Sequence, residues 1–211
     1  DLTERLRAEQ ELQKEKELSD KIINSLPGLF YLTDPTPKLL RWNNAFEKIS
    51  GYTAEELKNI VPINLFNEED HTAVKQSLEK TYREGLSDVE ARLHTKNGKN
   101  IPFYFTGVGL AYNGKPAMLG TGINITDRKI TEEKIIKEKL LSDTIINNLP
   151  GIFYLYDEQG HFLRWNKNFE KVSGYSAQEI STMHPLDFYD ETEKEKIKTR
   201  INFFRNDISN L

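Results

Sequence analysis

Two stretches of this chain nearly coincide: Arg41-Trp-Asn-Asn-Ala-Phe-Glu-Lys-Ile-Ser-Gly-Tyr52 and Arg164-Trp-Asn-Lys-Asn-Phe-Glu-Lys-Val-Ser-Gly-Tyr175. The likeness extends outward from them without a gap, so residues 1–88 align with residues 124–211, and about 34 of about 88 pairs are identical. A solenoid unit spans only about 20 to 50 residues, whereas a repeat of this length suits a domain with its own core. The sequence therefore predicts one kind of domain, repeated in series.

The alignment predicts four parts in the chain. Residues 1–17 are expected to be a signalling helix from a preceding domain, and residues 124–140 a connecting helix. Residues 18–123 form the first, complete module and residues 141–211 the second. Because the second copy stops at the position of Asp88, we expect it to lack its last three strands.

Composition excludes several classes of function. With 29% charged residues and a net charge of −4, the chain suits soluble domains and offers no basic face for nucleic acid. The absence of cysteine excludes disulfides, thiolate metal sites and cysteinyl cofactor adducts. No apolar run approaches the roughly 20 residues that a membrane span needs. We therefore expect a cytoplasmic segment without membrane contact.

Two segments have the composition of amphipathic helices. Residues 1–25 and 124–148 are rich in Glu, Lys and Leu or Ile, and they lack Gly and Pro until each stops at Leu-Pro-Gly. Their apolar spacing is not a clean heptad, which leaves two hypotheses open: paired helices of a homodimer, or solitary solvated helices.

Between these helices the sequence predicts strands and short helices. Strands are expected at 28–34 and 38–42, then helices that begin with the capping boxes Thr53-Ala-Glu-Glu56 and Ser176-Ala-Gln-Glu179, and a longer helix at 68–84. Three strands follow at 89–96, 100–112 and 115–125, joined by two Asn-Gly dipeptides that favour tight hairpin turns. The order predicts an α+β fold with a five-stranded antiparallel sheet and helices on one face.

At this point the sequence resembles the PAS sensor domain. The resemblance rests on Asp34 and Asp157 at strand ends, on the Trp-Asn to Gly-Tyr stretch quoted above, and on Pro62 with Asp70. It also rests on Thr95-Lys-Asn-Gly98 and on the closing segment Gly120-Thr-Gly-Ile-Asn-Ile-Thr-Asp-Arg128, which is similar to that family's Asp-Ile-Thr exit motif. Asn124 stands where the family usually has Asp, which weakens the expectation of a salt bridge from that position to Arg128.

The resemblance implies a small-molecule pocket between the sheet and the short helices, with output through the flanking helix to an effector domain in the same protein, such as a histidine kinase or a diguanylate cyclase. The residues expected to carry the signal out are Asn124, Thr126, Asp127 and Arg128. The residues expected to line the pocket are Phe30, Leu32, Leu40, Trp42, Asn43, Phe46, Leu65, Leu78, Phe103, Phe105 and Met118, with Phe153, Leu155, Trp165, Asn166 and Phe169 in the second copy.

Two of these positions have a second interpretation. Trp42 and Asn43 would be a pocket wall and a ligand-orienting amide, or else a core side chain and the N-cap of the next helix, and the capping preference of Asn favours the latter. Apolar candidates would likewise line a cavity or simply fill the core.

The cofactor stays unknown. Haem needs an axial His, and His71 aligns with Lys194 in the second copy, which argues against it. Flavin is disfavoured because no specific contact set is present and a thiol adduct is impossible.

No catalytic or metal-binding motif is present. The sequence lacks a P-loop, a nucleophile elbow and a zinc-protease motif, and the carboxylates of residues 68–70 are best explained as solvated charges at a helix start. The expected function is a non-catalytic sensory module, and the alternative is a ligand-free scaffold for dimerisation and spacing.

Overall fold

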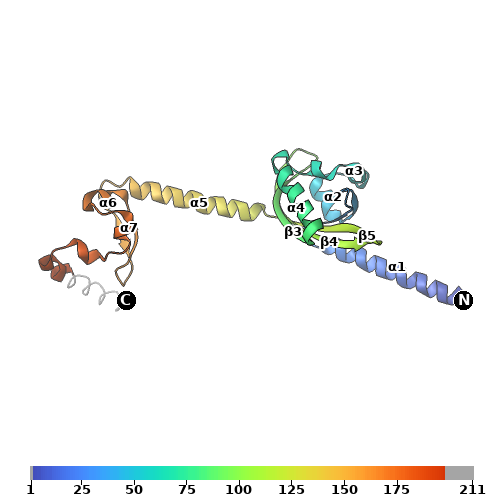
Figure 1. Cartoon of the computed structure of the whole chain (residues 1–211), viewed down its shortest axis with the longest axis horizontal. Helices are drawn as coiled ribbons and strands as arrows, with labels where there is room; N and C mark the ends of the chain where they lie inside the picture. Colours follow the sequence, from blue (N-terminus) through green and yellow to red (C-terminus); the bar gives the residue numbers. More distant parts are fainter. Residues whose placement is uncertain (1, 198–211) are drawn as a thin grey trace. The chain divides into compact units, whose positions relative to one another are not determined.

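The computed structural model describes residues 2–197, and the chain divides into two compact units, Asp1–Thr131 and Glu132–Leu211 (Figure 1). The first unit contains one five-stranded antiparallel sheet in the order β2-β1-β5-β4-β3. Its strands are β1 (Leu29–Thr33), β2 (Leu39–Trp42), β3 (Leu86–His94), β4 (Asn100–Tyr112) and β5 (Lys115–Asn124).

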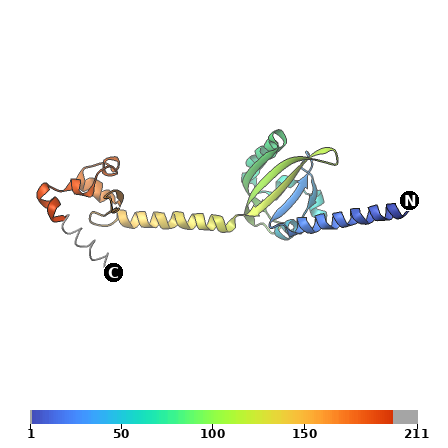
Figure 2. The same ribbon diagram turned by 90° about the horizontal axis from the view of Figure 1, so that it is seen from below.

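Helices cover one face of this sheet. In Figure 1 they lie above strands β4 and β5, and Figure 2, seen from below, shows the other face of the sheet in front of them. The α+β fold predicted from the sequence is therefore confirmed. The helices between β2 and β3 are α2 (Asn44–Ser50), α3 (Ala54–Asn59), the short 3-10 helices η1 (Pro62–Leu65) and η2 (Glu68–Asp70), and α4 (His71–Glu84).

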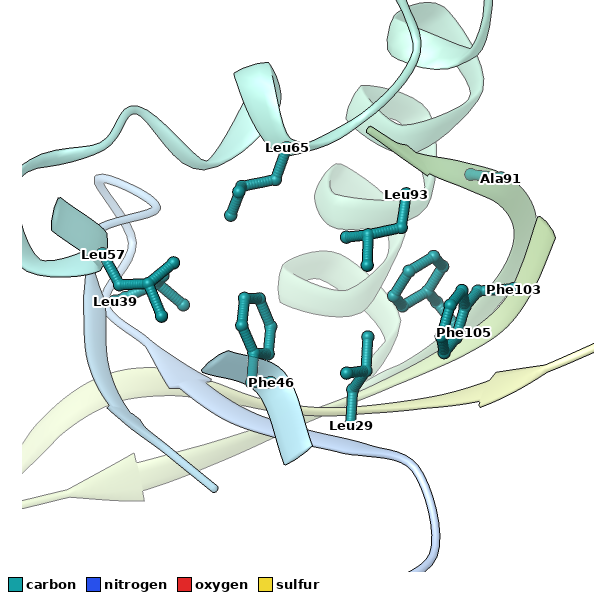
Figure 3. Close-up of a cluster of buried hydrophobic side chains, with 9 residues drawn as sticks. All are labelled: Leu29, Leu39, Phe46, Leu57, Leu65, Ala91, Leu93, Phe103 and Phe105. Atoms are coloured by element: carbon teal, nitrogen blue, oxygen red, sulfur yellow. The ribbon is translucent and has the colours of Figure 1, made fainter. Parts of the chain in front are cut away.

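The core of the first unit lies between the helices and the inner face of the sheet. Figure 3 shows side chains from both layers pointing toward one another, with Phe46 and Leu65 on the helix side and Phe105 on the sheet side. Full burial of one such side chain contributes about 1.5–3 kcal/mol. The nine members of this cluster are Leu29, Leu39, Phe46, Leu57, Leu65, Ala91, Leu93, Phe103 and Phe105.

Both predicted capping boxes are present. The Thr53 hydroxyl accepts from the Glu56 amide at 3.3 Å, while the Glu56 carboxylate accepts from the Thr53 amide at 2.9 Å. Ser176 and Glu179 repeat this exchange at 3.3 and 2.8 Å. These reciprocal bonds satisfy amides that a helix start leaves free, which explains why both short helices begin there.

Only one of the two Asn-Gly dipeptides forms the predicted tight turn. Asn113 and Gly114 both have positive φ, 51° and 72°, as the two-residue turn between β4 and β5 requires. At the other hairpin only Gly98 has positive φ, and the loop spans 95–99. There the Thr95 hydroxyl accepts from the Lys99 amide at 3.0 Å and donates to the Asn97 side chain at 2.6 Å, so side chains close a longer loop.

Long helices flank the sheet in the chain, as predicted. They are α1 (Leu2–Ser25) and α5 (Thr126–Asn147), and no residue of either is buried. Near its end α1 is fastened to the module, because Asp20 binds Arg41 at 2.5 Å and the Asn24 side chain accepts from the Asn44 amide at 2.8 Å.

The second unit repeats the start of the first. Its elements are β6 (Tyr154–Tyr156), β7 (Phe162–Trp165), α6 (Lys167–Ser173), α7 (Ala177–Ile180) and η3 (Pro185–Phe188). Strands β6 and β7 pair antiparallel, and Phe162, Phe169 and Ile180 form a small core. The helix contact also recurs, since Asp143 binds Arg164 at 2.5 Å and Asn147 accepts from the Lys167 amide at 2.9 Å.

Candidate functional site

A cavity of about 230 Å³ lies in the first unit between the inner face of the sheet and the helices η1 and α4. Most of its lining is apolar, as in most small-molecule sites. Five of the predicted residues line it: Phe46, Leu65, Leu78, Phe105 and Met118. Apolar lining residues that the sequence did not single out are Tyr31, Pro37, Leu39, Val61, Pro62, Ile63, Phe66, Val74, Val89 and Leu93.

The remaining predictions for the first unit lie outside this lining. Phe30 and Leu32 are 8% and 5% exposed, and they alternate along β1 with Tyr31 and Thr33, which face the cavity. Leu40 is 43% exposed because its neighbour Leu39 is the inward residue of β2. Phe103 is fully buried in the core cluster and is likewise outside the cavity lining. The assumed strand parity was therefore wrong on β1 and β2.

Trp42 and Asn43 hold the start of α2 and do not line the cavity. The Trp42 indole donates to Glu47 at 3.0 Å. Asn43, 1% exposed, is the N-cap of α2: its side-chain oxygen accepts from the amides of Phe46 at 3.1 Å and Phe30 at 3.2 Å. Its side-chain nitrogen donates to the Gly28 carbonyl at 2.9 Å. The capping interpretation accounts for both residues.

The second unit repeats this arrangement of Trp and Asn at the start of a helix. Asn166 accepts from the Phe153 amide at 3.0 Å and the Phe169 amide at 3.1 Å, and Trp165 donates to Glu170 at 3.2 Å. Among the predicted residues of this unit, only Phe169 lines a hollow there, together with Tyr154, Phe162 and Phe188. Leu155 is 51% exposed.

The polar groups of the first cavity lie on β1, α4, β3 and β4. On β1 the Tyr31 ring packs across Gly120, where an added Cβ would lie 2.2 Å from the ring. Burial raises the pKa of the Tyr31 phenol well above its usual value, so the phenol stays protonated. The other polar lining residues are Thr33, Lys75, Ser77, Ser87 and Thr106.

The predicted exit residues are held differently from the usual motif. Asn124 accepts from the amide and the hydroxyl of Thr126 at 2.9 and 2.5 Å, so its side chain satisfies the first amide of α5. Arg128 pairs with Glu90 on β3, and Lys129 binds the same carboxylate at 2.6 Å. These two cations, Lys129 foremost, lower the pKa of Glu90. Asp127 is exposed at the first turn of α5.

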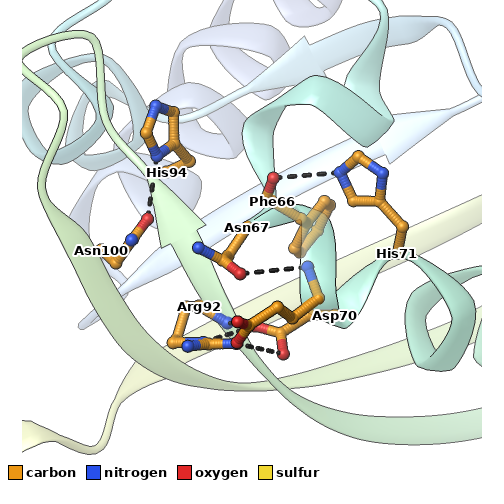
Figure 4. Close-up of polar contacts among 8 residues, drawn as sticks. Phe66, Asn67, Asp70, His71, Arg92, His94 and Asn100 are labelled. Atoms are coloured by element: carbon orange, nitrogen blue, oxygen red, sulfur yellow. Dashed lines mark hydrogen bonds and ion pairs between the residues drawn. The ribbon is translucent and has the colours of Figure 1, made fainter.

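A second polar site links η2 to β3. Asp70 accepts from the main-chain amide of Arg92 at 2.7 Å and from two guanidinium nitrogens, both at 2.9 Å (Figure 4). The Arg92 side chain holds the pKa of this carboxyl below its usual value. The interpretation of residues 68–70 as solvated charges is therefore wrong for Asp70, whose side chain is 19% exposed.

The histidines near this site have structural partners. His71 contacts the Phe66 carbonyl at 3.1 Å and His94 contacts Asn100 at 2.8 Å (Figure 4). Within residues 2–197 no three His, Cys, Asp or Glu side chains come together in a way that could hold a metal ion. Over the same span no helix has both the length and the apolar character needed to traverse a bilayer.

Comparison with known proteins decides the family. A family model described as PAS fold matches residues 17–108 and 141–206. The chain belongs to the PAS family. The two matched segments correspond to the two copies of the sequence repeat, and no match was found among curated proteins.

Solved structures that are similar to this chain include several PAS domains. The PAS domain of an HTR-like protein from Haloarcula marismortui is 15% identical with a TM-score of 0.52, covering 56% of this chain and 98% of that chain. A PAS domain from Colwellia psychrerythraea is 19% identical, with a TM-score of 0.48 and coverages of 53% and 97%. A domain of a sensory box sensor histidine kinase/response regulator from Geobacter sulfurreducens is 18% identical, with a TM-score of 0.45 and coverages of 54% and 96%.

Sequence reasoning missed the lining residues Tyr31, Thr33, Val74 and Val89. Tyr31 and Thr33 share a strand face with the buried Leu29, but the run Leu29-Phe-Tyr-Leu-Thr33 is apolar enough on both faces to hide the alternation. Val74 could have been found, because it shares with Leu78 the apolar stripe of the helix predicted at 68–84.

Proposed function

We propose that the first PAS module is a sensor that holds a small, mainly apolar molecule in its cavity and relays occupancy through helix α5 to an effector domain in the same protein. The cavity carries this proposal. A well-packed core leaves few voids larger than a water molecule, whereas this one is larger than the roughly 150 Å³ that accommodates benzene.

A mechanical route from cavity to helix supports the relay. Val89 lines the cavity on β3, and the next residue along that strand, Glu90, binds Arg128 and Lys129 in the first turn of α5. A ligand that favours one position of β3 would thereby favour one position of α5, provided that it binds the two arrangements with different affinities. The segment itself is a non-catalytic sensory module.

Native mass spectrometry of the chain, followed by extraction under denaturing conditions, tests the proposal. We expect a stoichiometric adduct that disappears on unfolding and appears in the extract as a small organic molecule. Protein that is empty after expression and also fails to take up any molecule from a metabolite extract would contradict it.

The second candidate function is a ligand-free dimerisation scaffold. The observation that favours it is the exposure of six apolar residues on α5, each more than half exposed: Ile130, Ile135, Ile136, Leu140, Leu141 and Ile145. Dimerisation through these helices is compatible with sensing, so only the ligand experiment separates the two functions.

A further inference from the structure

Two hydroxyl groups in the cavity make no hydrogen bond to any residue that the structure describes. The Thr33 hydroxyl is buried without a partner, and it is the only buried side-chain nitrogen or oxygen in residues 2–197 of which this is true. Tyr31, two residues earlier on the same face of β1, also lines the cavity, and its hydroxyl, which is not fully buried, makes no hydrogen bond within that range either. A buried hydroxyl without a partner costs about 1–3 kcal/mol, so Thr33 stands out in a core that is otherwise satisfied.

The neighbouring hydroxyls are already engaged. Tyr82 lies close to Thr33, but it donates its proton to the Asp34 carbonyl at 2.9 Å, and the two hydroxyls do not meet in hydrogen-bond geometry. On the other side of the cavity, Ser77 contacts Ser87 at 2.8 Å. Ser87 in turn contacts Thr81 at 2.5 Å, and Thr81 donates to the Ser77 carbonyl at 3.0 Å. Free hydrogen-bonding capacity is therefore concentrated on β1.

The near absence of charge in the cavity lining disfavours a charged ligand. Lys75 is the only charged residue among those that line the cavity, and its side chain is exposed to solvent. An ion buried next to Tyr31 and Thr33 would lose its hydration without gaining an opposite charge, which is strongly unfavourable. A neutral polar group incurs no such penalty once it is hydrogen-bonded.

We infer that the cavity is built for a compact, neutral, mainly apolar molecule that carries one carbonyl or hydroxyl group, bound by the hydroxyls of Tyr31 and Thr33. This inference rests on the proposed function, because it names the chemistry of the ligand of that same cavity. The volume of about 230 Å³ suits roughly ten non-hydrogen atoms, scaled from benzene in roughly 150 Å³.

The second module differs from the first at one of these two positions. Tyr154 repeats Tyr31, but Tyr156 stands at the position of Thr33, and the rings of Tyr154 and Tyr156 stack with centroids 6.1 Å apart. Strand β6 therefore has a second tyrosine in place of the small Thr33, and the Tyr154 hydroxyl already has Tyr189 as a hydrogen-bond partner, so we assign this ligand to the first module alone.

Three probes of nine non-hydrogen atoms test the inference: acetophenone, its hydrocarbon counterpart α-methylstyrene, and benzoate. Titrations use the chain refolded from denaturant, which releases any resident molecule, with carbon-13 in the methionine methyl groups. The Met118 methyl reports on the cavity, and Met183 in the second unit is the built-in control. We expect acetophenone to shift Met118 and to bind about three- to tenfold more tightly than α-methylstyrene, the effect of one neutral hydrogen bond.

Two variants test whether the hydroxyls of Thr33 and Tyr31 cause the preference for acetophenone. Thr33→Val and Tyr31→Phe each remove one hydroxyl with little change of shape, and either should reduce the acetophenone preference while leaving α-methylstyrene affinity unchanged. Equal affinities of the two neutral probes for the wild-type chain would overturn the inference and leave the proposed function standing. Tightest binding of benzoate would also overturn it. No shift of Met118 with any probe would count against both.

Discussion

Asn43 is the residue that joins helix α1, strand β1 and helix α2. Its amide group is almost fully buried, yet each of its atoms is used: the oxygen accepts two main-chain amides, and the nitrogen donates to the carbonyls of Gly28 and Ile23. Asn166 repeats the arrangement in the second unit. This position needs a short side chain that can both donate and accept hydrogen bonds, and Asn has one.

We therefore expect Asn43→Ala to lower the free energy of unfolding by about 2–4 kcal/mol, because it removes a cap and leaves the buried Phe30 amide unsatisfied. Urea denaturation of the first module measures this. Asn67→Ala is the matched control: Asn67 caps only the short helix η2 through one bond of 3.1 Å at the surface, and we expect less than about 1 kcal/mol. Equal losses in both variants would contradict the assigned role of Asn43.

Asp70 should make the stability of the first module depend on pH. Its pKa is lower in the folded state than in the unfolded state, so its stabilising effect is present above the unfolded pKa of about 4 and is lost as pH falls below it. Asp70→Asn should cost about 1–3 kcal/mol at pH 7 and much less at pH 3, measured by urea unfolding at both values. A difference between wild type and variant that does not shrink in acid would contradict this.

At this scale the sequence predicted the caps correctly but not the side of the strand on which a residue lies. Asn43, Thr53 and Ser176 were predictable because a cap depends on residues within one turn. The facing of Phe30 and Tyr31 depends on which side of β1 the helices pack, and both faces are partly covered, so hydrophobicity alone did not distinguish them. Five of the eleven residues predicted to line the first cavity consequently line it.

Helix α5 is attached to the module through Glu90 on β3. Two cations from its first turn share this carboxylate, and the Asn124 side chain accepts from the amide of Thr126, the first residue of the helix. The sequence indicated an exit segment here, but a partner 38 residues before Arg128 is a long-range contact that local patterns do not reveal. It emerges only when β3 pairs with β4 and β4 with β5.

We expect Glu90→Gln to increase amide hydrogen exchange in residues 126–129 several-fold, because the first turn of α5 loses the carboxylate on β3 that pairs with Arg128 and Lys129. Glu84→Gln is the control, since Glu84 pairs with Arg83 at 2.6 Å at the end of α4 and not with a cation of α5. Exchange in residues 126–129 that stays at the wild-type rate in Glu90→Gln would show that the ion pair does not hold the helix.

At the level of the whole molecule, the apolar side chains on α1 and α5 are not buried by any residue in the described range 2–197. This supports pairing of two chains through these helices. Leu140→Glu should then shift sedimentation equilibrium toward monomer by at least tenfold in dissociation constant, because it places a charge among the exposed apolar residues of α5. Lys139→Glu changes an exposed polar position of the same helix and should have a much smaller effect. Identical behaviour of both variants would argue against a helical dimer.

Occupancy of the cavity should change the first turn of helix α5, and hydrogen exchange on a chain with a filled cavity measures this effect. Val74→Trp places an indole into the cavity from α4, whereas Val108→Trp makes the same change at an exposed position of β4 outside it. We predict altered exchange at residues 126–129 in Val74→Trp and wild-type exchange there in Val108→Trp. Altered exchange confined to the cavity lining in Val74→Trp would show that filling the cavity does not affect α5.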